Sequence, residues 1–143
     1  MFKKILLGLA VIVAAVYVWN ASWRAAPPEG NVELIAHRGV HQTFDRADLT
    51  NDTCTAERID RPTHDYLENT IPSMQAAFAA GADIVELDVH PTTDGKFAVL
   101  HDWTVDCRIV GTGKTRGHDL ASLKLLDVGY GYTADGGATY PFR

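Results

Sequence analysis

The stretch Ile84-Val85-Glu86-Leu87-Asp88-Val89 decides how the rest of the chain is interpreted. In an extended strand successive side chains point to opposite faces, so Glu86 and Asp88 share one face and the apolar residues share the other. Two carboxylates on one face of an otherwise apolar strand repel each other and resist desolvation. A hard divalent cation, Mg²⁺ or Ca²⁺, relieves both penalties because it prefers oxygen ligands. The alternative is an exposed antiparallel strand with a polar face.

The overall charge limits the choice of partner. The chain has 143 residues and a formal net charge of -5, without a basic stripe. Nucleic-acid binding depends on clustered lysines and arginines that contact phosphates. We therefore exclude nucleic acid as the main partner.

The first residues predict a membrane-targeting segment. Met1-Phe2-Lys3-Lys4 is followed by an uncharged run from Ile5 to Trp23, close to the roughly 20 residues that span a bilayer. The lysines should stay in the cytoplasm, so the rest of the chain should lie outside it, in the periplasm or the extracellular space. We expect an uncleaved signal-anchor that makes the membrane a partner. The alternative is a secreted protein whose signal is removed near Asn20-Ala21-Ser22.

This reading divides the chain into three parts. Residues 1–23 form the signal-anchor or transmembrane segment, and residues 24–31, with Pro27-Pro28 and Gly30, form a stiff tether. Residues 32–143 form the domain.

The two cysteines, Cys54 and Cys107, agree with export. An even number of cysteines in an oxidising compartment predicts one disulfide bond. In a cytosolic protein the same residues would be two unrelated buried thiols.

Periodicity predicts an α/β fold. The expected elements are a strand at 32–36, a long polar segment at 40–67, a helix from Thr70 to Gly81, strands at 84–89 and 96–100, and a short helix at 119–126. Strand, helix and strand at this spacing indicate a parallel arrangement. Only about three strands are present, whereas an eight-stranded barrel needs roughly 200 residues or more. If the fold is a barrel, the chain contains only its first part.

Four polar clusters lie at or just beyond the predicted strands. They are His37-Arg38, Glu68-Asn69, Glu86 with Asp88, and His101-Asp102. In α/β folds this rim is where binding and catalytic residues collect. Two histidines can act as general base and general acid, and arginine presents a planar fork to phosphate. A cation held by the two strand carboxylates would neutralise charge on phosphoryl oxygens.

The ordered motifs resemble the glycerophosphodiester phosphodiesterase family. They are His37-Arg38-Gly39, Glu68-Asn69-Thr70, Val85-Glu86-Leu87-Asp88-Val89, Thr93-Asp94-Gly95 and Leu100-His101-Asp102. The resemblance implies a TIM-barrel-type fold of the phospholipase-C-like phosphodiesterase superfamily. It also implies metal-dependent hydrolysis of a glycerophosphodiester to sn-glycerol 3-phosphate and an alcohol.

The same resemblance assigns roles to individual residues. His37 and His101 match the acid/base pair, and Arg38 matches the phosphate clamp. Glu86 and Asp88 match the ligands of a divalent cation. The residues that would support this site are Glu68, Asn69 and Asp102.

Two departures from the family pattern keep alternatives open. A third acidic metal ligand and the remaining barrel strands would follow Arg143, so we expect an N-terminal part of a longer enzyme or a truncated product, unstable and inactive by itself. Residues 40–67 form a long insert that we expect to influence substrate choice. The alternative functions are a lysophospholipase D or sphingomyelinase D relative, and a non-catalytic, membrane-tethered phosphate-binding fragment.

Overall fold

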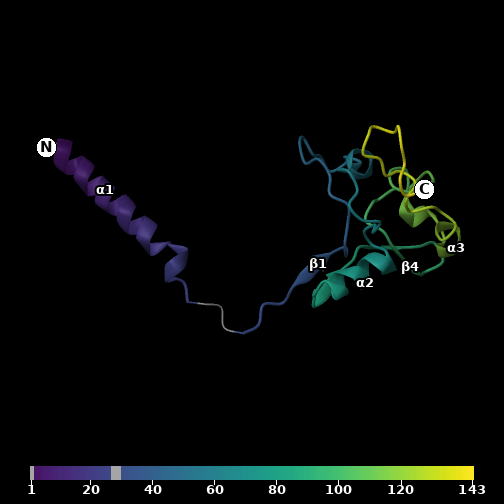
Figure 1. Ribbon diagram of the computed structural model, residues 1–143, viewed down its shortest axis with the longest axis horizontal. Helices are drawn as coiled ribbons and strands as arrows, with labels where there is room; N and C mark the ends of the chain where they lie inside the picture. The colour runs from purple at the N-terminus through teal and green to yellow at the C-terminus, as the bar shows by residue number, and fades with distance from the viewer. Residues whose placement is uncertain (1, 27–29) are drawn as a thin grey trace. The chain divides into compact units, whose positions relative to one another are not determined.

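The computed structural model describes residues 2–26 and 30–143. The chain divides into two compact units, residues 1–32 and residues 33–143, which are treated separately below. Figure 1 shows the elements of both units.

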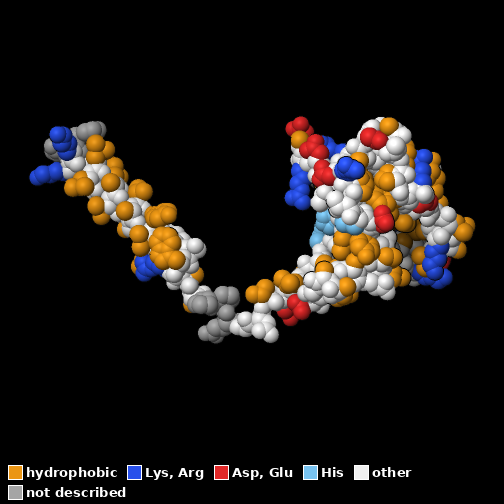
Figure 2. All heavy atoms as spheres, viewed as in Figure 1, with side chains coloured by type: hydrophobic (Ala, Val, Ile, Leu, Met, Phe, Trp, Pro, Cys, Tyr) orange, Lys and Arg blue, Asp and Glu red, His pale blue; other side chains and the backbone are white. Residues whose placement is uncertain are grey.

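The first unit is a single helix followed by a short turn. Helix α1 (Phe2–Trp19) ends before the apolar run of the sequence does, and η1 (Ser22–Arg24) is a separate 3-10 turn. Apolar side chains cover the visible side of α1 (Figure 2). None of the helices in the described part of the chain combines the length and the apolar character needed to span a bilayer. Residues 27–29 of the predicted tether lie outside the described residues.

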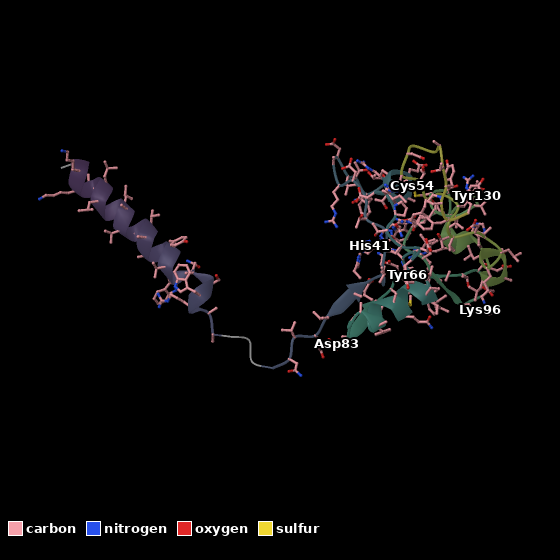
Figure 3. The ribbon with its side chains drawn as sticks, in the orientation of Figure 1. His41, Cys54, Tyr66, Asp83, Lys96 and Tyr130 are labelled. Carbon is pink, nitrogen blue, oxygen red and sulfur yellow. A yellow bond between two sulfur atoms is a disulfide. The ribbon has the colours of Figure 1, made fainter. Side chains whose placement is uncertain are left out.

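The second unit begins with a strand-helix-strand motif. Strand β1 (Ile35–His37) pairs in parallel with β2 (Ile84–Glu86), and helix α2 (Ile71–Ala79) lies between them in the sequence. The register places His37 opposite Glu86 at the carboxyl ends of both strands. The Leu34 N–H donates to Asp83 Oδ2 (2.9 Å), which fixes the opposite end of the pair, where Figure 3 labels Asp83. The parallel α/β arrangement expected from the sequence is therefore present.

Local sequence signals explain the limits of α2. Thr70 Oγ1 accepts a hydrogen bond from the Ser73 N–H (3.4 Å) as the N-cap, and Pro72 lies in the first turn, where its missing N–H leaves no hydrogen bond unmade. The chain leaves the helix through Gly81, whose φ of +99° suits a residue without a Cβ. Ser73 and Ala77 form its buried side.

The strand expected at residues 84–89 is divided in the structure. Strand β2 ends at Glu86, and β3 (Val89–Pro91) instead pairs antiparallel with β4 (Phe97–Val99) in a second two-stranded sheet. Leu87 and Asp88 lie between the strands, so the expectation of one continuous strand was wrong. The five-residue connection from β3 to β4 is too short for a crossover, and the strands form a hairpin.

The remaining elements are short. They are the 3-10 turns η2 (Thr55–Arg58) and η3 (Thr115–Gly117), and helix α3 (Leu120–Leu123), which is shorter than the helix expected at 119–126. The two sheets do not close into a barrel within residues 33–143. The TIM-barrel architecture stays a prediction.

The hydrophobic core lies away from the strands. It consists of Ala56, Ile59, Leu67 and Tyr132, with Phe44, Phe142 and both cysteines packed against it. Cys54 and Cys107 form a disulfide bond with their Cα atoms 5.7 Å apart. Gly131 passes directly against the Cys107 carbonyl, where no Cβ would fit. The segment expected to be a polar loop, residues 40–67, therefore supplies much of the core.

Candidate active site

Arg38 follows β1 in a left-handed backbone conformation. Its φ is +60°, uncommon outside glycine, and the conformation is fixed by hydrogen bonds on both sides. The Arg38 N–H donates to the Glu86 carbonyl (3.0 Å), and the Arg38 carbonyl accepts from the Asn69 N–H (2.9 Å). Asn69 also has a φ of +60°. Such strained residues persist where the surrounding structure over-determines them, and they concentrate at functional sites.

The Arg38 side chain lies between two carboxylates. Its Nη1 donates to Glu68 Oε1 (3.1 Å), and its Nε lies 2.9 Å from Asp88 Oδ2. The second contact is an ion pair by distance, but its geometry is not that of a hydrogen bond. Asn69 clamps Asp88 from the other side: its Nδ2 donates to Asp88 Oδ2 (3.0 Å), and its Oδ1 accepts from the Asp88 N–H (3.1 Å). The guanidinium is thereby held rigidly, with Nη2 free of hydrogen bonds and ion pairs to the described residues.

His37 and Glu86 form a looser pair beside this cluster. Their nearest atoms, His37 Nε2 and Glu86 Oε2, are 3.8 Å apart, and both side chains are substantially exposed. The parallel register places them on neighbouring strand ends. Both groups are open to solvent and to a ligand.

The fourth predicted cluster, His101-Asp102, is joined to the others by a residue that sequence reasoning missed. His101 Nδ1 lies 2.8 Å from Asp102 Oδ1, and Arg108 Nε donates to Asp102 Oδ2 (2.8 Å). Arg108 Nη1 is also 3.3 Å from Glu68 Oε2, so Glu68 lies between two arginines. A continuous chain of polar contacts therefore runs from Asp88 through Arg38, Glu68 and Arg108 to the His101-Asp102 pair.

Arg108 is buried, with 6% of its surface exposed. Burial by itself would lower the pKa of Arg108, but the fields of Tyr132, Glu68 and Asp102 outweigh burial and raise the pKa above its ordinary value. Arg108 also donates to the Tyr132 hydroxyl (3.0 Å) and to Thr55 Oγ1 (2.7 Å). A single arginine in a glycine-containing loop carries no sequence signal for this role, because its partners come from three distant segments.

Tyr132 connects this polar chain to the core. Burial raises the pKa of the Tyr132 hydroxyl, and the Arg108 charge opposes that shift. Its ring packs edge-on against Phe142, with the centroids 5.8 Å apart. Tyr132 thus contacts both the site and the hydrophobic core.

Glu68 and His101 also line a shared small cavity. Its volume is about 30 Å³, and Arg108 and Tyr132 also line it. The glutamate and the histidine, 33 positions apart in the sequence, therefore belong to one site.

The acidic residues fit a divalent cation in ligand type. Among the described residues the Glu86 carboxylate contacts only His37, at 3.8 Å. Asp88 Oδ1 has no hydrogen bond or ion pair with the described residues. Both carboxylates therefore keep oxygen atoms for a hard cation. Within residues 2–26 and 30–143, however, no three acidic, histidine or cysteine side chains converge closely enough to enclose one. The described chain supplies two ligands and no complete cage.

Comparisons with known proteins agree with the sequence motifs. The sequence profile of the Glycerophosphoryl diester phosphodiesterase family matches residues 37–141. The chain is 45% identical over 62 residues to a glycerophosphodiester phosphodiesterase of Caldanaerobacter subterraneus, covering 43% of this chain and 26% of that protein. It is 44% identical over 87 residues to human glycerophosphodiester phosphodiesterase 1, covering 61% of this chain and 20% of that protein.

A solved structure is also similar. The glycerophosphodiester phosphodiesterase of Agrobacterium tumefaciens matches with a TM-score of 0.48 and 28% identity, covering 68% of this chain and 33% of that one. The chain spans about a fifth to a quarter of the length of these two curated relatives. Because the family profile covers most of the sequence, this chain belongs to the glycerophosphoryl diester phosphodiesterase family.

Proposed function

We propose that the candidate active site hydrolyses a glycerophosphodiester to sn-glycerol 3-phosphate and an alcohol. The observation that carries this proposal is the clamped guanidinium of Arg38, held by Glu68 and Asp88 and adjoined by His37 and Glu86. A rigid guanidinium binds a phosphodiester through charge-assisted hydrogen bonds without losing side-chain entropy on binding. Nη2 of Arg38 is the nitrogen that remains for this purpose.

The two histidines supply proton transfer. One imidazole removes a proton from the attacking oxygen, which forms the new bond to phosphorus. The other gives a proton to the alkoxide as the bond between phosphorus and the alcohol oxygen breaks. The contact between Asp102 and His101 Nδ1 fixes the ring and leaves Nε2 as the nitrogen for transfer. We assign His101 to the leaving group and His37 to the nucleophile.

A divalent cation would bind to Glu86 and Asp88, the two carboxylates with free oxygen atoms. A cation bound there supplies positive charge to the phosphoryl oxygens. Arg108, the other arginine of the described site, is already paired with Glu68 and Asp102.

We also propose that the domain works in an oxidising compartment outside the cytoplasm. The support is the disulfide between Cys54 and Cys107, because structural disulfides persist mainly in exported proteins.

The test is an assay of a purified longer protein that contains these 143 residues, because we expect the chain by itself to be inactive. The substrates are glycerophosphocholine and lysophosphatidylcholine. Choline, which hydrolysis releases from both, is measured with choline oxidase, and sn-glycerol 3-phosphate, which only glycerophosphocholine can release, is measured with its NAD-dependent dehydrogenase. We expect product from glycerophosphocholine, loss of turnover with EDTA, and recovery with Mg²⁺ or Ca²⁺. Cleavage of the lysophospholipid alone would contradict the substrate assignment.

The cation ligands have a separate test. Asp88→Asn keeps the side-chain shape but removes the charge, so more cation should be needed for half-maximal turnover. Asp83→Asn, which changes a carboxylate at the opposite end of β2, is the matched control. Turnover that is indifferent to chelators in both variants would remove the cation from the proposal.

A further inference from the structure

A second cavity adjoins the His101-Asp102 pair, and Arg38, Glu68 and Asp88 do not line it. Its volume is about 240 Å³. One wall is His101, Asp102 and Trp103, and the opposite wall comes from residues 51–54 of the long insert. The disulfide partners Cys54 and Cys107 both line it, so a covalent bond holds the two walls together.

Apart from His101, which is protonated when it acts as the proposed acid, the charged side chains that line this cavity have one sign. Asp52 and Asp102 contribute carboxylates, and no lysine or arginine lines it. Asp102 is compensated by Arg108, whose Nε donates to it (2.8 Å). Asp52 is exposed and forms no ion pair with the described residues. The uncompensated charge at the mouth of the cavity is therefore negative.

Trp103 adds an aromatic surface. The residue is 67% exposed, so part of its ring is accessible to a ligand. Its ring already accepts one cation, because Arg116 Cζ lies 4.5 Å from the ring centroid. Arg116 does not itself line the cavity. An indole next to an uncompensated carboxylate is the environment that favours ammonium groups, through cation–π attraction and charge.

We propose that this cavity binds the alcohol half of the substrate and selects alcohols that carry an ammonium group. The inference rests on the proposed hydrolysis, in which His101 protonates the leaving alkoxide. That alkoxide must lie beside His101, and the cavity opens beside the same residue. Its volume is below the roughly 300–1,000 Å³ of pockets for drug-sized ligands, which suits a small head group better than an acyl chain.

The first experiment measures binding without catalysis. Choline chloride is titrated into ¹⁵N-labelled protein, and the indole N–H signal of Trp103 is followed by NMR, with glycerol and sodium chloride as neutral and ionic controls. Choline should shift this signal in a saturable way and glycerol should not. Asp52→Asn should weaken choline binding about two- to fivefold, as expected for an exposed charge pair.

Two substitutions of Trp103 and a matched charge substitution at Asp48 complete the binding experiment. Trp103→Phe should keep most of the affinity and Trp103→Leu should lose about two- to fivefold. Asp48→Asn makes the same charge change in the same insert, away from the cavity, and should bind choline normally. If Trp103→Leu fails to fold, the exposed Asp52→Asn still decides the outcome. Equal choline affinity in Asp52→Asn and Asp48→Asn would overturn the proposal.

The second experiment measures selectivity. The ratio of kcat/KM for glycerophosphocholine to kcat/KM for glycerophosphoglycerol should exceed one, and Asp52→Asn should lower it about two- to fivefold. Hydrolysis of both substrates with an unchanged ratio would overturn the head-group site and leave the hydrolytic function intact. Choline binding at Trp103 without any hydrolysis would support the cation site and contradict the hydrolytic function.

Discussion

In the second unit the loops contain the hydrophobic core cluster and the strands leave apolar side chains exposed, which is the reverse of the usual arrangement. The loop region, residues 40–67 and 101–143, contains the buried core, the disulfide and Arg108. The strand region, residues 33–39 and 68–100, carries six of the eight predicted polar site residues. It nevertheless leaves many apolar side chains exposed: Ile35, Ile84, Val89, Phe97 and Val99. Site residues here are positioned less by a buried sheet than by polar contacts, one of which joins Glu68 to Arg108 of the cross-linked loop region.

The two regions meet at Glu68. Arg38 approaches this carboxylate from the strand region, and Arg108 approaches it from the loop region. Ion pairs of this kind stabilise little when exposed, but breaking a buried one leaves a charge without compensation. The variants below separate the contributions of the two regions.

The largest effect should come from His101→Ala. This change removes the proposed proton donor at the junction of the regions, and turnover should fall by about two to four orders of magnitude. The measurement is kcat for glycerophosphocholine. The control is His118→Ala, which should keep normal turnover. The His118 side chain is partly buried, and its one hydrogen bond within the described residues is with the Thr112 carbonyl. Near-normal turnover in His101→Ala would make this histidine structural.

Replacing Arg108 by Met should break the connection between the regions. Glu68 loses one of its two arginines and Asp102 loses its buried partner, so unfolding free energy should fall by about 3–5 kcal/mol. Urea unfolding measures the change. Arg61→Met, at an exposed residue, is the control and should stay within about 0.5 kcal/mol. A small loss for Arg108→Met would mean that the regions are held together by other contacts.

Removing the disulfide should destabilise the loop region. The bond joins residues 53 positions apart, and loop-closure entropy for a loop of this size predicts a loss of about 4 kcal/mol for Cys54→Ser with Cys107→Ser. The comparison is urea unfolding of the double variant and of the wild-type protein with and without dithiothreitol. Unchanged stability on reduction would show that the core alone maintains this region.

Gly39→Ala tests how closely the turn after β1 approaches α2. A Cβ there would lie 2.6 Å from Ser73 Oγ, and the φ of +76° disfavours a side chain, so we expect a loss of about 1–3 kcal/mol. Gly113→Ala has a similar φ of +95° but open space around it. The difference between the two variants in thermal unfolding isolates the packing contribution, and equal losses would contradict it.

The smallest effect should come from the exposed strand face. Val99 is 43% exposed, so Val99→Thr should change unfolding free energy by no more than about 0.5 kcal/mol. Val105→Thr makes the same change at a fully buried position in the loop region and should lose about 1–3 kcal/mol. Reversed magnitudes would contradict the contrast between the two regions.

Local signals in the sequence predicted the parts of the fold that are locally determined. Thr70 and Pro72 mark the start of α2, and Gly81 marks its end, because capping depends on neighbouring residues. The break at Leu87-Asp88 was not predictable in the same way, since an alternating pattern continues unchanged through it. There two hydrogen bonds between Asn69 and Asp88, one donated by each residue, replace pairing with β1.

The candidate site was predictable where motifs lie on strand ends and not where it depends on the loops. The predicted polar clusters are linked by contacts in the structure, but the residue that links Glu68 to the His101-Asp102 pair is Arg108. Its partners Thr55, Glu68 and Tyr132 are 53, 40 and 24 positions away in the sequence. Contacts between residues so far apart in the sequence produce no periodic pattern that predicts them.

The disulfide has a topological consequence. The covalent ring closed by Cys54 and Cys107 contains every predicted site residue from Glu68 to Asp102, and only His37 and Arg38 lie outside it. A single proteolytic cut within the ring, such as one in the exposed turn at Asp94-Gly95, therefore cannot release a fragment. The cut protein would run as one band on a non-reducing gel and as two bands after reduction. Such a two-chain form would retain both walls of the cavity beside His101.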